Sequence, residues 1–261
     1  MIPINELGRI RDLLEEKYNQ YNTIDFIESD PIKIPHLFNG KENIEISAFL
    51  TSSIAWGQRV TIVKNAKLLM HLMDNDPYDF LVNSLEGDIQ NIKKFSHRTF
   101  NTDDTLFFIK SLANIYKKYN GLEAVFTEEY KSTSDIIKSI QHFRNIFFEL
   151  PHEKRTEKHI ADISKGASAK RLNMFLRWMV RQDDHSVDFG LWKEIPSSAL
   201  YIPLDVHTGN VARNLGLINR KQNDWKSVEY LTNILRSFDP DDPVKYDFAL
   251  FGMGINEKIK N

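Results

Sequence analysis

Apolar residues recur at helical spacing along nearly the whole chain. In residues 5–21, Leu7, Ile10, Leu14 and Tyr18 fall on one face of a helix. The same period predicts further helices at about 41–55, 60–73, 77–82, 102–119, 122–130, 133–149, 206–215, 224–237 and 243–253. Because the alternation typical of β-strands is nearly absent, the pattern predicts an all-α protein.

The helix expected at 102–119 carries a clear start signal. Asn101 or Thr102 is suited to cap its N-terminus. Asp103 and Asp104 then place negative charge in the first turn, where the helix dipole favours it. A helix boundary is therefore expected at this point of the chain.

Length and composition are those of an ordinary globular protein. The chain has 261 residues, 41% of them hydrophobic, and a formal net charge of -2, which argues against indiscriminate nucleic-acid binding but permits a local basic face. It contains no cysteine, so disulfides, thiolate nucleophiles, cysteine-ligated zinc and iron–sulfur clusters are excluded. No signal peptide and no membrane-spanning run is recognisable. We therefore expect a cytoplasmic protein without a membrane partner.

The most informative stretch of the sequence begins with a short turn, Gly166-Ala167-Ser168, that opens into a helical pattern. Residues 165–181 carry five positive charges and no negative one, at Lys165, Lys170, Arg171, Arg177 and Arg181. A helix that starts after a glycine turn leaves its first N–H groups unpaired and directs its positive dipole end outward. The sequence therefore predicts a basic helix start suited to a phosphate.

A carboxylate follows this helix after an insert. Residues 182–198 are acidic and proline-containing, and their aspartates are expected in a solvated loop. Asp205 then stands at the start of the next helix, where it also suits an N-cap. A lysine amine and a carboxylate brought together beside a phosphate-binding turn suggest chemistry on a sugar of nucleic acid.

Three motifs, in this order, resemble those of the helix-hairpin-helix DNA glycosylases of base-excision repair. They read ISAFLTSSIAWGQRVTIVKNAKLLMHL, then G-x-x-x-K-R-L-N-x-x-L from Gly166, then P-L-D-V-H-T-x-x-V-A-R from Pro203. The similarity covers roughly residues 44–220, and the whole chain also resembles a bacterial family of conserved hypothetical proteins. Two features depart from the pattern: Ser168 replaces the usual second hairpin glycine, and the lysine and the aspartate are unusually far apart.

The resemblance implies one two-lobed helical domain, residues 1–261, with a cleft between the lobes and no iron–sulfur cluster. Lobe one would span about 40–181 and include the hairpin at 160–181. Lobe two would combine 1–39 with 182–261. Neither a cofactor nor a metal ion is implied.

The resemblance also assigns the catalytic roles. Lys170 would attack C1′ of a deoxyribose, displace the base and form a Schiff base that permits strand cleavage, with Asp205 in support and Arg171 of the right sign to assist. Asn173 matches an asparagine frequent in the family. From the residues alone, the alternative is that Lys170 is a solvated lysine, as most helix lysines are. For Asp205 the alternative is a helix N-cap, a role that is compatible with catalysis.

The DNA contacts implied by the resemblance come from turns. Gly166, Ala167 and Ser168 would offer N–H groups to a phosphate, although an ordinary interhelical turn is the alternative. Trp56 and Gln58 lie in the turn of the first motif and would fill the gap left by a flipped base, whereas the alternative for Trp56 is a cap on the core.

Three further residues complete the expected site. Arg98, next to His97 at the start of a helix, would reach DNA, or the two would form an exposed loop pair. Trp192 in the insert would stack on an extruded base or simply anchor the loop. His207 would line the base pocket or pack nearby; a metal pair with Asp205 lacks further ligands at suitable spacing.

The function implied is that of a monomeric, metal-independent DNA glycosylase of base-excision repair with β-lyase activity. Its partner would be double-stranded DNA that contains an abasic site or a damaged base, an oxidised purine in our interpretation. The alternative is a non-catalytic helix-hairpin-helix module that binds nucleic acid or a partner protein.

Overall fold

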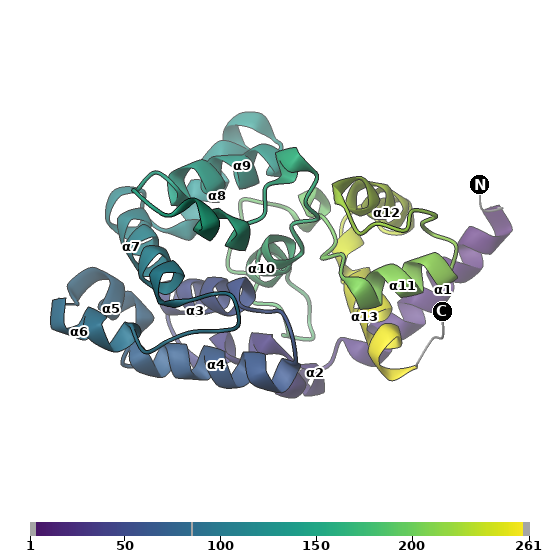
Figure 1. Ribbon diagram of the computed structural model, residues 1–261. Coiled ribbons are helices and arrows are strands. Elements are labelled where there is room, and N and C mark those ends of the chain that lie inside the picture. The colour runs from purple at the N-terminus through teal and green to yellow at the C-terminus, as the bar shows by residue number, and fades with distance from the viewer. Residues whose placement is uncertain (1–3, 85, 258–261) are drawn as a thin grey trace. The chain divides into compact units, whose positions relative to one another are not determined.

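The computed structural model describes residues 4–84 and 86–257, whose regular elements are all helices (Figure 1). Within these residues the extended pairings are two isolated bridges, His97 with Phe100 and Ala167 with Asp224. The prediction of an all-α protein is confirmed. None of the described helices combines the length and the apolar character needed to cross a membrane.

The chain divides into two compact units. Unit 1 combines the residues up to Phe26 with those from Asp162 onward, and unit 2 runs from Ile27 to Ala161. The expected lobes differ from these units in two places. Residues 162–181 belong with the C-terminal helices instead of the middle ones, and residues 27–39 belong with the middle helices. Ion pairs explain the first difference, since Arg177 is buried against Asp247 near the C-terminus.

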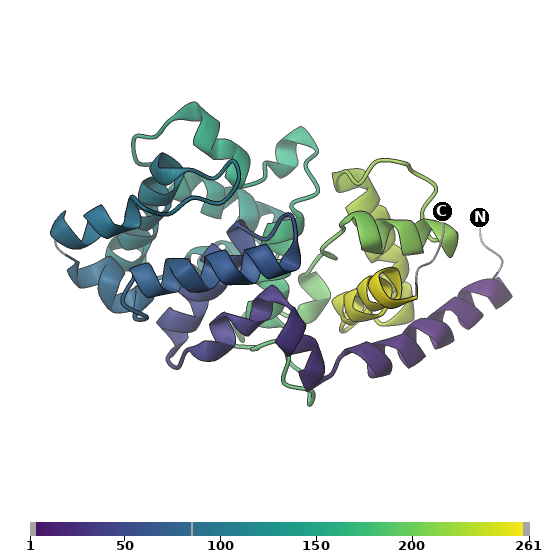
Figure 2. The same ribbon diagram turned by 60° about the horizontal axis from the view of Figure 1, so that its bottom comes forward.

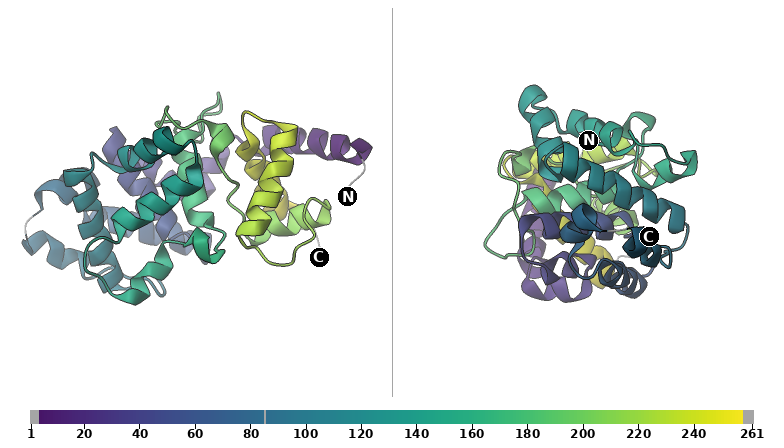
Figure 3. Two further views of the ribbon diagram at one scale, coloured as in Figure 1. Left: turned by 90° about the horizontal axis from the view of Figure 1, so that it is seen from above. Right: turned by 90° about the vertical axis from the view of Figure 1, so that its left-hand side faces the viewer.

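Unit 1 is built around its C-terminal helix. Its main helices are α1 (Ile4–Tyr21), α10 (Lys170–Val180), α11 (Val206–Asn214), α12 (Trp225–Phe238) and α13 (Tyr246–Asn256). Both α1 and α11 pack along α13, as Figures 2 and 3 show. Helix α1 buries Ile10, Leu14 and Tyr18, the face that the apolar spacing predicts.

Unit 2 contains a phenylalanine-rich core. Its α-helices are α3 (Lys41–Ser53), α4 (Arg59–Leu72), α5 (Pro77–Asn83), α6 (Glu86–Ile92), α7 (Thr102–Lys118), α8 (Leu122–Thr133) and α9 (Ile136–Phe147). Helices α8 and α9 pack side by side (Figure 1). The buried rings of Phe49, Phe108, Phe143 and Phe147 contact one another between α3, α7 and α9.

Helix boundaries follow the capping chemistry of the sequence. Asn101 caps α7 in a reciprocal capping box with Asp104, as the start signal there predicts. The pattern missed α2 (Ile24–Ser29) and α6, which have only six and seven residues. So few residues make less than two helical turns, too short for an apolar period to stand out. The equally short α5 was predicted because Asp76 and Pro77 mark its start.

Candidate functional site

Lys170 and Asp205 meet in unit 1. The Nζ atom of Lys170 lies 4.0 Å from Oδ2 of Asp205, and the side chains are 27% and 19% exposed. The sequence places them on different helices, so their contact results from the tertiary packing of unit 1. A nucleophilic residue type and a carboxylate therefore face each other where solvent still reaches both.

A tight turn sets the position of Lys170. The 3-10 helix η4 (Ile163–Lys165) ends at Gly166, which is left-handed with φ 83°, and Ala169 is left-handed again with φ 51°. Lys170 is then the first residue of α10, whose N-terminus has no side-chain cap. The N–H of Trp225 donates to the Gly166 carbonyl at 2.9 Å, which fastens the turn to the start of α12.

The hydrogen bonds of this turn contradict part of the prediction that its N–H groups bind a phosphate. The N–H of Gly166 donates to the carbonyl of Ile163 at 2.8 Å, and the N–H of Ala167 donates to that of Asp162 at 3.3 Å. Both groups are used inside the turn, so their assignment to a phosphate is wrong. The left-handed glycine causes this, because it folds the chain back over a 3-10 helix instead of joining two α-helices. For Ser168 the assignment stays a prediction.

Asn173 links the two segments that lead to the pair. It is buried, and its Nδ2 lies 3.2 Å from the Ser168 carbonyl and 3.5 Å from that of Ile202. One acceptor precedes Lys170 by two residues, and the other precedes Asp205 by three. The side-chain amide of Asn173 therefore connects the segment that precedes Lys170 with the segment that precedes Asp205.

Asp205 is held by its own helix. Its Oδ1 accepts from the N–H of Thr208 at 2.9 Å, so the predicted N-cap of α11 is confirmed. Its carbonyl accepts from Nδ2 of Asn223 at 2.7 Å. Because capping uses Oδ1, the Oδ2 atom remains directed at Lys170. The capping role and a chemical role are thus compatible.

Arg177 does not belong to a basic surface, contrary to expectation. Its guanidinium is buried, with Nε 3.3 Å from Oδ1 of Asp188 and Nη1 2.5 Å from Oδ2 of Asp247. Asp188 is itself buried, so the prediction that the acidic insert is a solvated loop is wrong for this residue. The positive and negative charges of the two segments neutralise each other inside the unit.

Arg181 is buried in the same way. It contacts Asp183 at 2.7 Å, Asp242 at 2.8 Å and Asp188 at 3.1 Å. The basic run in the sequence therefore contributes only Lys165, Lys170 and Arg171 to the vicinity of the turn. Arg171 is half-buried, and this burial lowers the pKa of its guanidinium to about 10. Its predicted contact with DNA stays a prediction.

Asp247 is a site residue that the sequence analysis missed. Burial raises its pKa to about 7, with Arg177 opposing and Asp205 reinforcing the shift. The hydroxyl of Thr208 lies 3.4 Å from its Oδ1, next to the cap on Asp205. One feature of the sequence indicates this role: Asp247 is the single carboxylate in the apolar run YDFALF. If this run forms a core helix, its carboxylate is buried and requires polar or charged partners.

Two further residues of unit 1 are predicted to contact a base, and the structure treats them differently. Trp192 is fully buried with its ring edge-on to Phe175 at 5.4 Å, so its assignment to base stacking is wrong and the loop-anchor alternative is confirmed. His207 is exposed, with its ring edge-on to Phe251 at 6.1 Å, and its place in a base pocket stays a prediction. Among the described residues, no group of three or more His, Asp or Glu side chains is arranged to hold a metal ion.

The remaining predicted residues lie in unit 2. Trp56 is half-buried, stacked on His159 at 5.8 Å and edge-on to His97 at 5.0 Å. This partly supports the alternative of a core cap. Gln58 is exposed at the start of α4, without a side-chain cap hydrogen bond, and its role stays a prediction.

Arg98 does not begin a helix, because α7 starts only at Thr102. It is left-handed, with φ 56°, in the turn between His97 and Phe100, and its side chain lies over Gly57. His97 is buried rather than exposed, with Nδ1 2.8 Å from Asn65 and a pKa lowered by burial. The expected exposed pair is therefore wrong for His97, while Arg98 is exposed.

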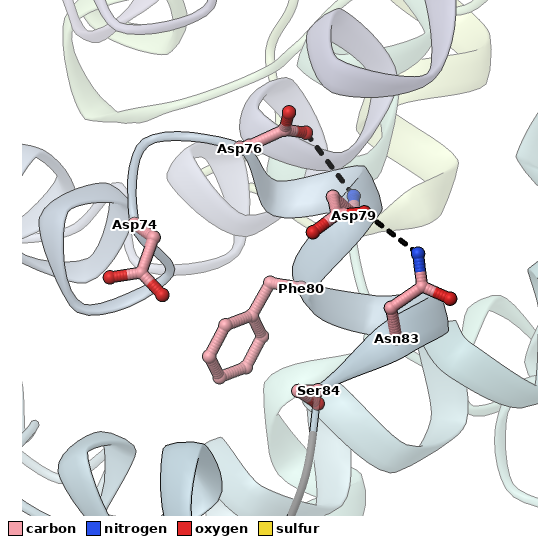
Figure 4. A pocket seen from close by; sticks show the side chains of 6 residues that line it. All are labelled: Asp74, Asp76, Asp79, Phe80, Asn83 and Ser84. Atoms are coloured by element: carbon pink, nitrogen blue, oxygen red, sulfur yellow. Dashed lines mark hydrogen bonds between the residues drawn. The ribbon is translucent and has the colours of Figure 1, made fainter.

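Unit 2 also has an acidic pocket (Figure 4). It is lined by Asp74, Asp76, Asp79, Phe80, Asn83 and Ser84. Asp76 caps α5 through the N–H of Asp79, and Asp79 accepts from Asn83 at 2.7 Å. The carboxylates of Asp76 and Asp79 therefore have structural roles in the first turns of α5. The negative charge of the pocket would repel a phosphate.

Comparison with known proteins assigns the chain to a family. The model of a family described as "Protein of unknown function (DUF2400)" matches residues 30–256. No curated protein and no solved structure matches the chain. The family match overturns the expected membership in the helix-hairpin-helix glycosylase superfamily, to which nothing in these comparisons connects the chain.

Proposed function

We propose, for a chain that belongs to the DUF2400 family of unknown function, that Lys170 is the nucleophile of a DNA glycosylase with β-lyase activity. One observation carries the proposal: the Lys170 amine and the Asp205 carboxylate lie 4.0 Å apart, and both are partly exposed. Lysine amines form Schiff bases with carbonyl carbons, and C1′ of an opened deoxyribose is such a carbon. A neighbouring carboxylate can take part in the proton transfers of such a reaction.

The proposed reaction starts with the free amine of Lys170. Its nitrogen attacks C1′ of a deoxyribose, and the bond to the damaged base breaks with both electrons leaving on the base, which takes up a proton. Opening of the sugar ring gives a Schiff base between Nζ and C1′. Loss of a proton from C2′ then expels the 3′ phosphate, which cuts the strand. Asp205 stabilises the positive charge that develops on the sugar.

The surroundings of Lys170 support a phosphate-bearing substrate. The N-terminus of α10 lacks a side-chain cap, and the positive end of the helix dipole lies there. Lys165 is 70% exposed in the same turn, where its Nζ lies 3.3 Å from Oδ2 of Asp162, and Arg171 follows Lys170 directly. Three cations and a helix N-terminus within seven residues favour an anion beside the amine.

Borohydride trapping tests the proposal. Incubating the protein with a duplex containing an abasic site and sodium borohydride should give a covalent protein–DNA adduct. Lys170→Ala should reduce its yield by at least about 100-fold, as expected when a covalent nucleophile is removed. Lys165→Ala is the matched control, because it removes a cation from the same turn and should leave most of the adduct.

Two results would contradict the proposal. One is the absence of any adduct with wild-type protein, on either abasic or 8-oxoguanine duplex. The other is an adduct that survives Lys170→Ala unchanged. A shift of the duplex in a gel without an adduct would favour the alternative of a non-catalytic nucleic-acid-binding module.

A further inference from the structure

Three consecutive residues at the start of α12, segment 223–225, hold the turn that precedes α10. The N–H of Trp225 donates to the Gly166 carbonyl at 2.9 Å. The preceding residue, Asp224, forms an isolated antiparallel bridge with Ala167. The turn that carries the lysine is therefore joined to segment 223–225 through the backbone at two consecutive residues.

The same segment also holds the start of α11. The Nδ2 atom of Asn223 donates to the Asp205 carbonyl at 2.7 Å. The ring of Trp225 lies 4.9 Å from the ring of Tyr201, which precedes Asp205 by four residues. Since segment 223–225 is attached on both sides, its contact with α11 helps to set how far the Asp205 carboxylate lies from the Lys170 amine.

The side-chain amide of Asn223 has one orientation that satisfies its partners. Its Oδ1 accepts from Nη1 of Arg213 at 3.0 Å, and Nη2 of the same guanidinium donates to Oδ1 of Asn210 at 3.1 Å. Because a guanidinium only donates and a backbone carbonyl only accepts, the NH₂ end of the amide must face Asp205. Arg213 therefore directs the Asn223 donor at the first turn of α11.

Gly209 leaves the space that this amide occupies. A Cβ atom at this position of α11 would lie 2.6 Å from Oδ1 of Asn223 and 2.8 Å from Nη2 of Arg213. Glycine inside a helix is less favourable than alanine. Here it permits the close approach of the Asn223 amide to α11, at the expense of helix stability.

The bond from Asn223 is not required to satisfy the Asp205 carbonyl. That carbonyl also accepts from the N–H of Gly209 at 2.9 Å, within α11. Loss of the Asn223 amide would therefore leave no unpaired acceptor at the start of the helix. It would remove a connection between α11 and the segment that holds the turn before Lys170.

We infer that Asn223 is a positioning residue of the proposed site, which acts through the Asp205 backbone to hold the Asp205 carboxylate beside the Lys170 amine. The inference rests on the proposed function for the use of this pair. The position of Asp205 relative to Lys170 is nevertheless measurable in the free protein, so the two can fail separately.

NMR of the protein with ¹³C-dimethylated lysines tests this position without DNA. The Lys170 methyl signal, assigned by its loss in Lys170→Arg, should shift in Asp205→Asn, which keeps the helix cap and removes a charge 4.0 Å from Nζ. Asn223→Ala should shift this signal in the same direction, because the carboxylate moves away. Gln222→Ala, which removes an exposed amide from the neighbouring residue, should leave the signal in place. A signal that also stays in place in Asn223→Ala would overturn the inference.

Gly209→Ala covers the case in which Asn223→Ala does not fold. The added methyl group displaces the Asn223 amide from α11, while alanine favours the helix. The Lys170 signal should therefore shift as in Asn223→Ala, with a denaturation midpoint that is unchanged or higher. A signal that stays in place in this variant would contradict the role of the amide.

Trapping on an abasic duplex measures what the position contributes to the reaction. At saturating duplex, Asn223→Ala should form the adduct at least about tenfold more slowly, because small displacements of reacting groups are costly. Its affinity for the duplex and the rate of Gln222→Ala should remain at the wild-type values. Adduct formation by Asn223→Ala at the wild-type rate refutes the positioning role alone. A shifted NMR signal without any adduct in the wild type refutes the proposed function and leaves the effect of Asn223 on Asp205 intact.

Discussion

Replacing Arg181 with alanine is expected to lower the free energy of unfolding by about 3–5 kcal/mol, because removal of one partner leaves buried charges unpaired. Arg181 is completely buried and contacts three carboxylates, those of Asp183, Asp188 and Asp242. It also donates to the hydroxyl of Tyr18 at 2.9 Å, which connects α1 to the cluster. Urea denaturation followed by circular dichroism measures the loss.

Arg11→Ala is the control for Arg181. Arg11 pairs with Asp12 on the surface of α1, where the two side chains are 51% and 70% exposed. Exposed pairs of this kind contribute little, so its removal should leave the denaturation midpoint nearly unchanged. Similar effects for both variants would show that the buried cluster does not stabilise unit 1.

Asp104→Ala is expected to cost about 3–5 kcal/mol in unit 2, because its buried partners lose a shared acceptor. The carboxylate has no exposed surface. It accepts from the Asn101 N–H at 3.0 Å, from the Thr156 hydroxyl at 2.7 Å and from Arg155 at 2.8 Å, and it lies 3.1 Å from Nε2 of His159. It therefore closes the capping box of α7 and attaches the segment after α9 to it.

The pH dependence of stability provides a second measurement on Asp104. Burial alone would raise its pKa, but the hydrogen bonds from Asn101 and Thr156 and the charge of His159 outweigh it, so the pKa is lowered. A group with a lowered pKa stabilises the fold above its unfolded pKa of about 3.9 and loses this contribution as the pH falls through the folded value. Asp104→Ala should therefore flatten the acid limb of the stability curve.

Asp103→Ala is the matched control for Asp104. Asp103 is exposed in the same helical turn, so its removal should cost only about 0.3–1 kcal/mol through the helix dipole. If the two variants lost equal stability, or if the acid limb were unchanged in Asp104→Ala, the network around Asp104 would not have the role described.

Local chemistry made much of the fold predictable. The apolar period located the longer helices, and short polar side chains located their starts, as Asn101 does for α7 and Asp205 for α11. These signals depend on neighbours within a few residues, which the sequence displays directly. The division into units depends on contacts between distant segments, and the expected lobe boundaries differed for that reason.

The distribution of charge could not be predicted in the same way. Arg177 and Arg181 look like the solvated cations Lys165 and Lys170 in the sequence, yet Asp247 and Asp242 neutralise the two arginines from 70 and 61 residues away. Trp192 was likewise assigned to a ligand, although its partner Phe175 precedes the insert. Whether a polar or aromatic residue is buried is decided by such distant partners.

Mass spectrometry of the trapped adduct tests the central claim most directly. The protein is reduced with borohydride on an abasic duplex, the DNA is digested with nuclease, and the peptides are sequenced to locate the sugar remnant. The account predicts the remnant on Nζ of Lys170, with the peptide that carries Lys165 unmodified at that residue. A remnant on any other amine, or none on the protein, would contradict it.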